Sequence, residues 1–251
     1  MMVPMSSVLL AVLFFVLGTV LGSFGNVVVL RGIKGLSLQG RSACPKCGRG
    51  LLAWELIPVI SFFLVGRRCR TCRVPLSWQY PLVEAGTGCL FVAALVRHDF
   101  SAMPGALLGV CLWLLLLLSL YDGKTGFIPD TLSLPFMGVA LLYAGNIHIV
   151  SWMAVAIGTG FFAVQWILTT GRGIGSGDIL LAIGIGILVG SVQLLLLSLF
   201  ISYIVGALFA ITLLVRKKMT FKSALPFGPF LAFGAAVSVL VGQNILERLG
   251  L

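Results

Sequence analysis

Long, uninterrupted apolar runs follow one another along the chain, with polar residues gathered between them. A run of about 20 apolar residues is long enough to cross the ~30 Å hydrocarbon core of a bilayer as a helix. Because the runs are continuous and do not alternate, they favour helices over the strands of a membrane barrel. We therefore predict an all-α, polytopic membrane bundle of about eight spans, at 5–29, 81–97, 103–120, 131–149, 151–170, 178–190, 191–215 and 225–246.

The first apolar run is also compatible with a signal peptide, but two features favour a retained span. No basic residue precedes it, and it is longer than the ~7–15 residues of a signal-peptide core. It ends at Arg31 and lacks a small-residue cleavage site. We predict three parts: a first transmembrane helix at 1–30, a polar loop at 31–80 and a membrane bundle at 81–251.

Composition and charge support this topology. The chain is 59% hydrophobic and 10% charged, with a net charge of +10, whereas a soluble domain carries about 25% charged residues. With eight spans, every basic residue except Arg97 and Arg248 falls on one side of the membrane. Basic loops stay cytoplasmic, so the 31–80 loop is predicted to be cytoplasmic. Nucleic-acid binding is the weaker interpretation of this charge, because no aromatic and basic surface accompanies it.

The loop carries two Cys-x-x-Cys pairs, Cys44 with Cys47 and Cys69 with Cys72. This spacing is typical of a four-thiolate zinc site. Two disulfides are the alternative, and a cytoplasmic location argues against them. A closed four-cysteine site is usually structural, and here it would fold a loop too small to form its own core. Cys89 and Cys111 lie within predicted spans and are expected to be packing residues.

Three aspartates lie at the predicted cytoplasmic edge of the spans: Asp122, Asp130 and Asp178. We predict that Asp130 is the N-cap of the helix that follows it. Asp178 can also cap a helix, but it follows a glycine-rich stretch that allows close backbone approach. Asp122 is predicted to lie in a loop together with Gly123 and Gly126. An ionisable group at a membrane edge is costly unless it is paired, hydrated or functional.

Two neighbouring carboxylates can act as the general base and the general acid of peptide hydrolysis. One carboxylate keeps its proton and the other acts as a base, so one activates water while the other donates to the peptide carbonyl. Other nucleophilic sets are disfavoured, because His98 and His148 lie on the opposite side in this topology. The sequence also lacks a phosphate-binding Gly-Lys-Ser/Thr motif.

Several motifs together resemble those of the bacterial type IV prepilin peptidases, which are membrane aspartic proteases with a Gly-x-Gly-Asp motif. The resemblance runs almost end to end. It rests on the two cysteine pairs and on these segments: Gly22-Ser23-Phe24-Gly25-Asn26-Val27-Val28, Ile57-Pro58, Tyr80-Pro81-Leu82-Val83-Glu84, Asp122 with Ile128-Pro129-Asp130, Gly175-Ser176-Gly177-Asp178, and Pro226-Phe227-Gly228-Pro229-Phe230-Leu231-Ala232.

The resemblance implies that Asp122 and Asp178 are the catalytic pair, with Asp130, Gly175 and Gly177 as accessory residues. It implies cleavage of prepilin or pseudopilin precursors of type IV pilus and type II secretion systems, at the bacterial inner membrane. It also implies N-methylation of the new N-terminus from S-adenosylmethionine, in the 31–80 loop and adjoining helix ends. The chain departs from the family where a lysine often follows the second aspartate, because Leu180 stands there.

Two other functions are compatible with the pair. One is a proton- or ion-coupled transporter that uses the aspartates as a relay, although transporters usually place such sites near the midplane. The other is a non-catalytic assembly protein that docks through the cysteine loop. The small-residue pairs Gly18 with Gly22 and Gly186 with Gly190 are interpreted as packing positions within the chain.

Overall fold

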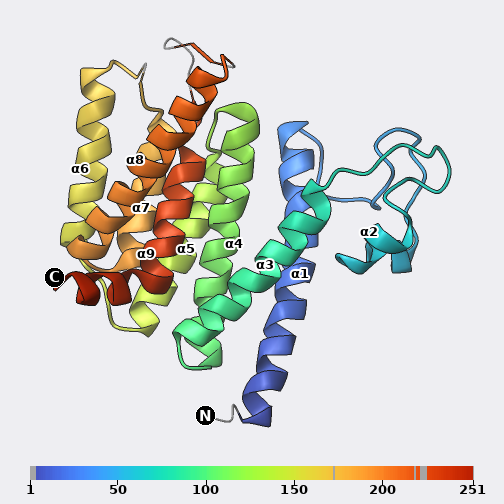
Figure 1. The fold of residues 1–251 in the computed structure, drawn as a ribbon, viewed down its shortest axis with the longest axis horizontal. Helices are drawn as coiled ribbons and strands as arrows, with labels where there is room; N and C mark the ends of the chain where they lie inside the picture. The colour runs from blue at the N-terminus through green and yellow to red at the C-terminus, as the bar shows by residue number, and fades with distance from the viewer. Residues whose placement is uncertain (1–3, 172, 218, 221–224, 251) are drawn as a thin grey trace. The chain divides into compact units, whose positions relative to one another are not determined.

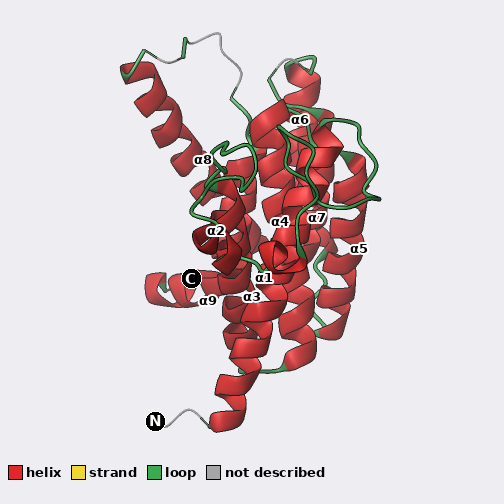
Figure 2. Cartoon of the chain, turned by 90° about the vertical axis from the view of Figure 1, so that its right-hand side faces the viewer, coloured by secondary structure: helices red, strands yellow, loops and turns green. Residues whose placement is uncertain are grey.

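The computed structural model describes residues 4–171, 173–217, 219–220 and 225–250. Within these residues the named elements are all helical, and the only β-pairs are two isolated bridges. Figure 1 follows the helices along the chain and Figure 2 shows the helices and the connecting loops by colour. The chain divides into two compact units, Met1–Gly109 and Val110–Leu251, and each is described by itself.

The first unit is built on a pair of long helices, α1 (Met5–Ile33) and α3 (Gln79–Arg97). The two helices approach closely because α1 has glycines at the contact. A Cβ at Gly18 would lie 2.8 Å from Cα of Gly88, and one at Gly22 would lie 2.8 Å from Cα of Glu84. The predicted packing of Gly18 and Gly22 within the chain is therefore confirmed.

The polar loop between α1 and α3 contains two short helices, η1 (Ala53–Leu56) and α2 (Ile60–Leu64). Each cysteine pair lies on a tight turn closed by an isolated bridge, Ala43 with Gly50 and Arg68 with Pro75. The turn at the first pair places Gly48 at a φ of 71°, a conformation that glycine adopts without a steric penalty.

The second unit is a helical bundle. It contains most of α4 (Ala102–Thr125), then α5 (Asp130–Asn146), α6 (Trp152–Leu168), α7 (Ser176–Val189), α8 (Val192–Val215) and α9 (Gly228–Leu249). Helix α7 contacts α5, α6, α8 and α9, and most of its residues are buried. Gly186 lets α7 approach α6, since a Cβ there would lie 2.8 Å from Cα of Val155. Its packing role is confirmed.

Each of the eight predicted ranges overlaps one of the longer helices, which confirms the helical fold class. Five of these helices are long and apolar enough to cross a membrane: α1, α3, α4, α8 and α9. Helices α6 and α7 are apolar but shorter. Helix α3 begins at Gln79, so Pro81 lies in its first turn, where a missing backbone N–H is tolerated.

One helix boundary differs from the prediction in a way that matters for the site. Asp122 is not in a loop, because α4 continues to Thr125. The Thr125 hydroxyl donates to the Tyr121 carbonyl at 2.8 Å, and Gly126 then ends the helix with a φ of 68°. A glycine in this left-handed conformation is a common helix terminator.

Candidate active site

Asp122 lies in the last turn of α4 and is 4% exposed. Its Oδ2 accepts a hydrogen bond of 2.8 Å from the backbone N–H of Gly228, the first residue of α9. A Cβ on Gly228 would lie only 2.7 Å from that oxygen. A side chain on Gly228 would therefore displace the Asp122 carboxylate or the start of α9.

Asp178 lies in the first turn of α7 and is 8% exposed. Its Oδ2 accepts a hydrogen bond of 3.0 Å from the backbone N–H of Gly175, the residue that caps the helix. A carboxylate three residues into a helix stabilises an N–H group that has no partner within the helix. The prediction that Asp178 can cap a helix is confirmed, and this contact also orients the carboxylate.

Asp122 is close enough to Asp178 to act on it electrostatically. Each carboxylate is held by a backbone N–H from a different segment, Gly228 for Asp122 and Gly175 for Asp178. The structure thus brings together the two aspartates that the sequence singled out.

The connection between α4 and α5 packs against the start of α7. A Cβ on Gly177 would lie 2.7 Å from Cβ of Ile128, which is buried. Asp130 follows in the same segment, but the prediction that it caps α5 is wrong. The cap position is occupied by Pro129, no side chain caps the helix, and Asp130 is an exposed residue of the first turn.

An aromatic group lies next to the pair and was not predicted. Tyr203 of α8 is close enough to Asp178 to be affected by its charge, and its ring centroid is 4.9 Å from that of Phe227. The Tyr203 hydroxyl donates to Oε1 of Gln165 at 3.2 Å. A glutamine within the apolar run of α6 was the sequence signal for this contact, because polar side chains in spans usually serve hydrogen bonding or function.

The four loop cysteines form one cluster. Their sulfur atoms all lie within 4.8 Å of one another, with 3.7 Å between Cys44 and Cys72 and 3.9 Å between Cys47 and Cys69. Four sulfurs at ~2.3 Å from a tetrahedral zinc are ~3.8 Å apart. All six cysteines of the chain are free, which excludes the disulfide alternative for this structure. The donor set fits a tetrahedral thiophilic metal.

The loop backbone favours the thiolate form of Cys69 and Cys44, whereas burial and contacts with the other thiols raise the pKa of Cys72 to about 11. The backbone N–H groups of Cys72 and Thr71 lower the pKa of the Cys69 thiol to about 6. The backbone N–H groups of Cys47 and Lys46 lower the pKa of Cys44 in the same way. Thiolates are the form of cysteine that binds metals.

An ion pair between Arg49 and Glu55 connects two parts of the loop beside the cysteines. Arg49 Nη2 lies 2.7 Å from Oε1 of Glu55, whose side chain is 3% exposed. The backbone N–H of Leu52 also donates to this carboxylate at 2.8 Å. The Arg49 hydrogen bond is the main cause that holds the pKa of Glu55 below its usual value.

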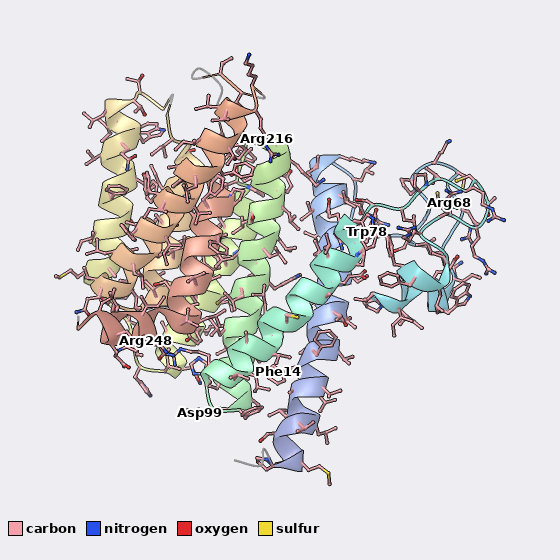
Figure 3. The ribbon with its side chains drawn as sticks, in the orientation of Figure 1. Phe14, Arg68, Trp78, Asp99, Arg216 and Arg248 are labelled. Atoms are coloured by element: carbon pink, nitrogen blue, oxygen red, sulfur yellow. The ribbon has the colours of Figure 1, made fainter. Side chains whose placement is uncertain are left out.

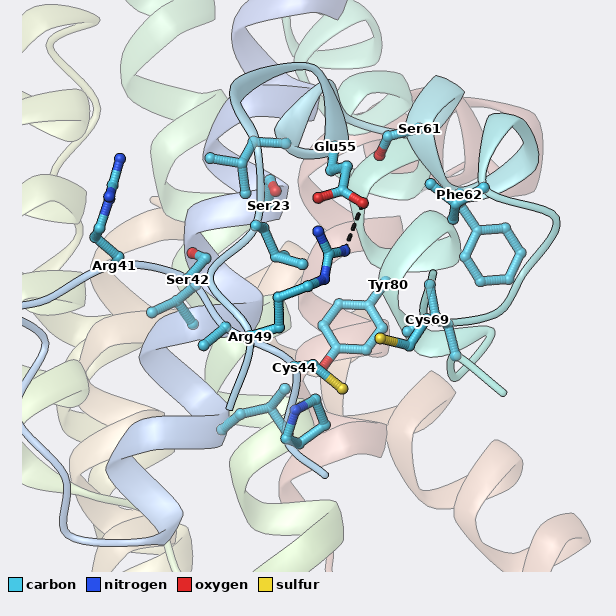
Figure 4. A pocket seen from close by; sticks show the side chains of 18 of the residues that line it. Ser23, Arg41, Ser42, Cys44, Arg49, Glu55, Ser61, Phe62, Cys69 and Tyr80 are labelled. Atoms are coloured by element: carbon cyan, nitrogen blue, oxygen red, sulfur yellow. Dashed lines mark hydrogen bonds and ion pairs between the residues drawn. The ribbon is translucent and has the colours of Figure 1, made fainter. Parts of the chain in front are cut away.

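A cavity of about 640 Å³ lies between α1, the loop and the start of α3. Figure 4 shows the Arg49–Glu55 pair within it, with Tyr80 and the sulfurs of Cys44 and Cys69 nearby. Ligand pockets commonly have volumes of ~300–1,000 Å³. The cavity combines acidic, basic and aromatic groups and is large enough for a nucleoside-sized ligand.

Two polar residues of the first-span and second-span motifs have packing roles. Asn26 of α1 accepts from Nε2 of Gln79 at 3.2 Å and lies 3.4 Å from the carbonyl of Tyr80. Glu84 of α3 accepts a hydrogen bond of 2.6 Å from the backbone N–H of Val59. These contacts tie α1, α3 and the loop together.

Comparisons with known proteins cover most of the chain. The model of the bacterial peptidase A24 N-terminal domain matches residues 16–98, and that of the type IV leader peptidase family matches residues 109–211. No solved structure matches the chain significantly.

Three relatives are named "Prepilin leader peptidase/N-methyltransferase". The one from Burkholderia pseudomallei (strain K96243) is 35% identical, over 94% of this chain and 86% of its own length. That from Bacillus subtilis (strain 168) is 34% identical, over 94% and 96%. That from Pseudomonas aeruginosa is 31% identical, over 96% and 93%. The chain therefore belongs to the prepilin leader peptidase/N-methyltransferase family, as its motifs predict.

Proposed function

We propose that the chain is an aspartic endopeptidase that removes the leader of type IV prepilins and pseudopilins, with Asp122 and Asp178 as its catalytic pair. The observation that carries the proposal is the burial of both carboxylates within electrostatic range of each other, each oriented by a single backbone N–H. The comparisons give no support to the transporter alternative.

The proposed reaction is general acid–base hydrolysis. Two carboxylates that share a site ionise more readily singly than together, so one is a base and the other an acid. The ionised carboxylate takes a proton from water, and the protonated carboxyl donates to the carbonyl oxygen of the scissile peptide. The hydrogen bonds from Gly228 and Gly175 keep the other oxygens in place, which limits the reorganisation needed during reaction.

The position of the pair suits a substrate that crosses the membrane boundary. Asp122 lies in the last turn of a candidate span, and Asp178 in the first turn of an apolar helix. A precursor whose basic leader is in water and whose apolar helix is in lipid has its scissile bond at this boundary. We propose that the exposed Asp130 serves as an accessory residue and that Gly175 and Gly177 shape the backbone there.

The test is incubation of the purified chain in detergent with a precursor that carries a Gly–Phe junction, followed by mass spectrometry. Asp122→Asn and Asp178→Asn should each abolish cleavage while leaving thermal unfolding unchanged. Asp99→Asn is the matched control, because Asp99 is an exposed aspartate outside the site. Cleavage by either of the two pair variants at the wild-type rate would refute the assignment.

We also propose that the 31–80 segment is a zinc-binding, cytoplasmic loop between the first transmembrane helix at 1–30 and the bundle at 81–251. Cys44, Cys47, Cys69 and Cys72 would supply all four ligands, which leaves no open position for a substrate. The metal would therefore stabilise the fold of the loop and take no part in the chemistry.

The cavity beside this cluster is our proposed site for S-adenosylmethionine. Its lining carries charges of both signs together with the Tyr80 ring, which can face a sulfonium, while Arg49 and Glu55 are already paired with each other. When bound, the cofactor supplies an electrophilic methyl group for the new N-terminal amine. The same mass spectrometry reports this second activity as the mass increase of one CH2 unit on the cleaved product, because a methyl group replaces a hydrogen of the amine.

A further inference from the structure

The loop carries an exposed apolar surface on α2 and its flanks. Ile60, Phe63 and Leu64 are 57%, 56% and 67% exposed, whereas Phe62 is 4% exposed and faces the cavity. A five-residue helix thus buries one side and presents three large apolar side chains on the other. Contiguous exposed apolar surface marks a binding surface for a protein or a membrane.

Two contacts fix α2 against the first turns of α3. The backbone N–H of Val59, which caps α2, donates to Glu84 at 2.6 Å, and Val59 has a φ of 62° that β-branched residues rarely adopt. The Trp78 ring lies 5.2 Å from the ring of Phe62 and 6.3 Å from that of Phe63. Figure 1 shows α2 at the level of the upper part of α3.

These contacts set the depth of α2 relative to a candidate span. Helix α3 begins at Gln79, so Glu84 lies ~7.5 Å along the helix axis from its start, at 1.5 Å per residue. Helices that lie in a membrane interface are buried to a similar depth of ~5–10 Å. In a bilayer that α3 begins to cross at Gln79, this attachment would place α2 at the same depth.

Exposed apolar side chains also lie at the start of α3, next to α2. Trp78 is 50% exposed and lies one helical turn before Leu82, which is 66% exposed. Residues four apart lie on the same face of a helix. Tryptophan is enriched at membrane–water interfaces, where its ring is in the headgroup region.

One basic side chain lies against this surface and others follow it along the chain. The Arg67 guanidinium lies over the Trp78 ring at 5.6 Å, and exposed Arg68, Arg70 and Arg73 follow. Figure 3 shows Trp78 at the start of α3 and Arg68 on the neighbouring loop. Clustered arginines at a bilayer surface are attracted to anionic headgroups.

We propose that α2 is an interfacial anchor that docks the loop on the surface of an anionic lipid bilayer. Ile60, Phe63 and Leu64 enter the boundary between headgroups and acyl chains, Trp78 lies at headgroup level, and the arginines contact lipid phosphates. This inference rests on the first unit alone and does not depend on the assignment of the aspartate pair.

The test uses the full chain in lipid nanodiscs with the photo-crosslinker p-benzoylphenylalanine in place of Phe63. The matched control places it at Leu38, which is 50% exposed in the same loop but outside this surface. Mass spectrometry should find lipid adducts at position 63 in at least fivefold excess over position 38. Equal lipid labelling at the two positions, or adducts of position 63 with a second copy of the chain, would overturn the proposal.

A second comparison tests the role of charge. In nanodiscs of phosphatidylglycerol the lipid adducts at position 63 should exceed those in phosphatidylcholine, and Arg67→Gln should reduce this excess by roughly fivefold. Zinc content measured on every variant shows whether the loop has folded. Adduct yields that are the same in both lipids would reject recognition of anionic headgroups, and yields in Leu64→Ser equal to the wild type would reject the apolar docking.

Discussion

The backbone N–H of Gly228 donates a 2.8 Å hydrogen bond to Oδ2 of Asp122, which joins the first residue of α9 to the last turn of α4. The contact depends on the missing side chain, since a Cβ on Gly228 would lie 2.7 Å from that oxygen. The position of one carboxylate of the pair is therefore controlled by a residue distant in sequence.

Gly228→Ala is expected to displace the Asp122 carboxylate and to lower kcat for precursor cleavage by about 100-fold, because misplacement by ~1 Å has effects of this size. Single-turnover cleavage in detergent measures the change. Gly160→Ala is the control, since a Cβ at Gly160 meets nothing within 4 Å. Equal kcat values for the two variants would show that the Gly228 contact is unimportant.

Gly177→Ala should disturb the contact between α7 and the α4–α5 connection. The new Cβ would lie 2.7 Å from that of Ile128, and overpacking of this kind costs ~1–3 kcal/mol. We expect a lower unfolding temperature together with slower cleavage. Gly138→Ala in α5, where a Cβ has open space, should leave the unfolding temperature within error of the wild type; a drop as large as that of Gly177→Ala would contradict this explanation.

Replacing one ligand of the cysteine cluster should release the metal. Purified wild-type protein is expected to contain about one zinc per chain, and Cys44→Ser should lower this several-fold and expose the loop to proteolysis. Elemental analysis and limited trypsin digestion measure the two effects. Cys89→Ser, which changes a cysteine of α3 outside the cluster, should retain the metal. Full zinc content in Cys44→Ser would exclude the four-thiolate site.

Glu84→Ala should separate the two activities. It removes the acceptor of the Val59 N–H and an acidic group from the cavity, while Asp122 and Asp178 are untouched. We expect N-methylation to fall by at least tenfold with cleavage reduced less than twofold, as read from the ratio of methylated to unmethylated product. Glu247→Gln changes an exposed acid of α9 and serves as the control. Unchanged methylation in Glu84→Ala would place the methyltransferase site elsewhere.

The candidate site could be predicted in part from the sequence, and the two errors have physical causes. Asp130 was predicted to cap α5, but the helix begins at Asp130 itself, one residue earlier than predicted, so Pro129 occupies the cap position. Asp122 was expected in a loop because Gly123 follows it. A single glycine in a helix costs only ~1 kcal/mol relative to alanine, and α4 continues to Gly126, where the backbone turns left-handed. The packing of α6, α8 and α9 brings three further residues near the aspartates: Gln165, Tyr203 and Gly228.

The order of the helices, the grouping of the four loop cysteines and the choice of the two aspartates follow from the sequence by itself. Lipid requires every backbone polar group to be satisfied within a segment, so an apolar run of sufficient length has few alternatives to a helix. The tertiary structure decided which backbone N–H groups donate to each carboxylate and where the cavity lies. It also decided that the residue before α2 donates a hydrogen bond to Glu84. These features depend on close approach between segments that are far apart in the chain, and apolar patterning carries no information about such contacts.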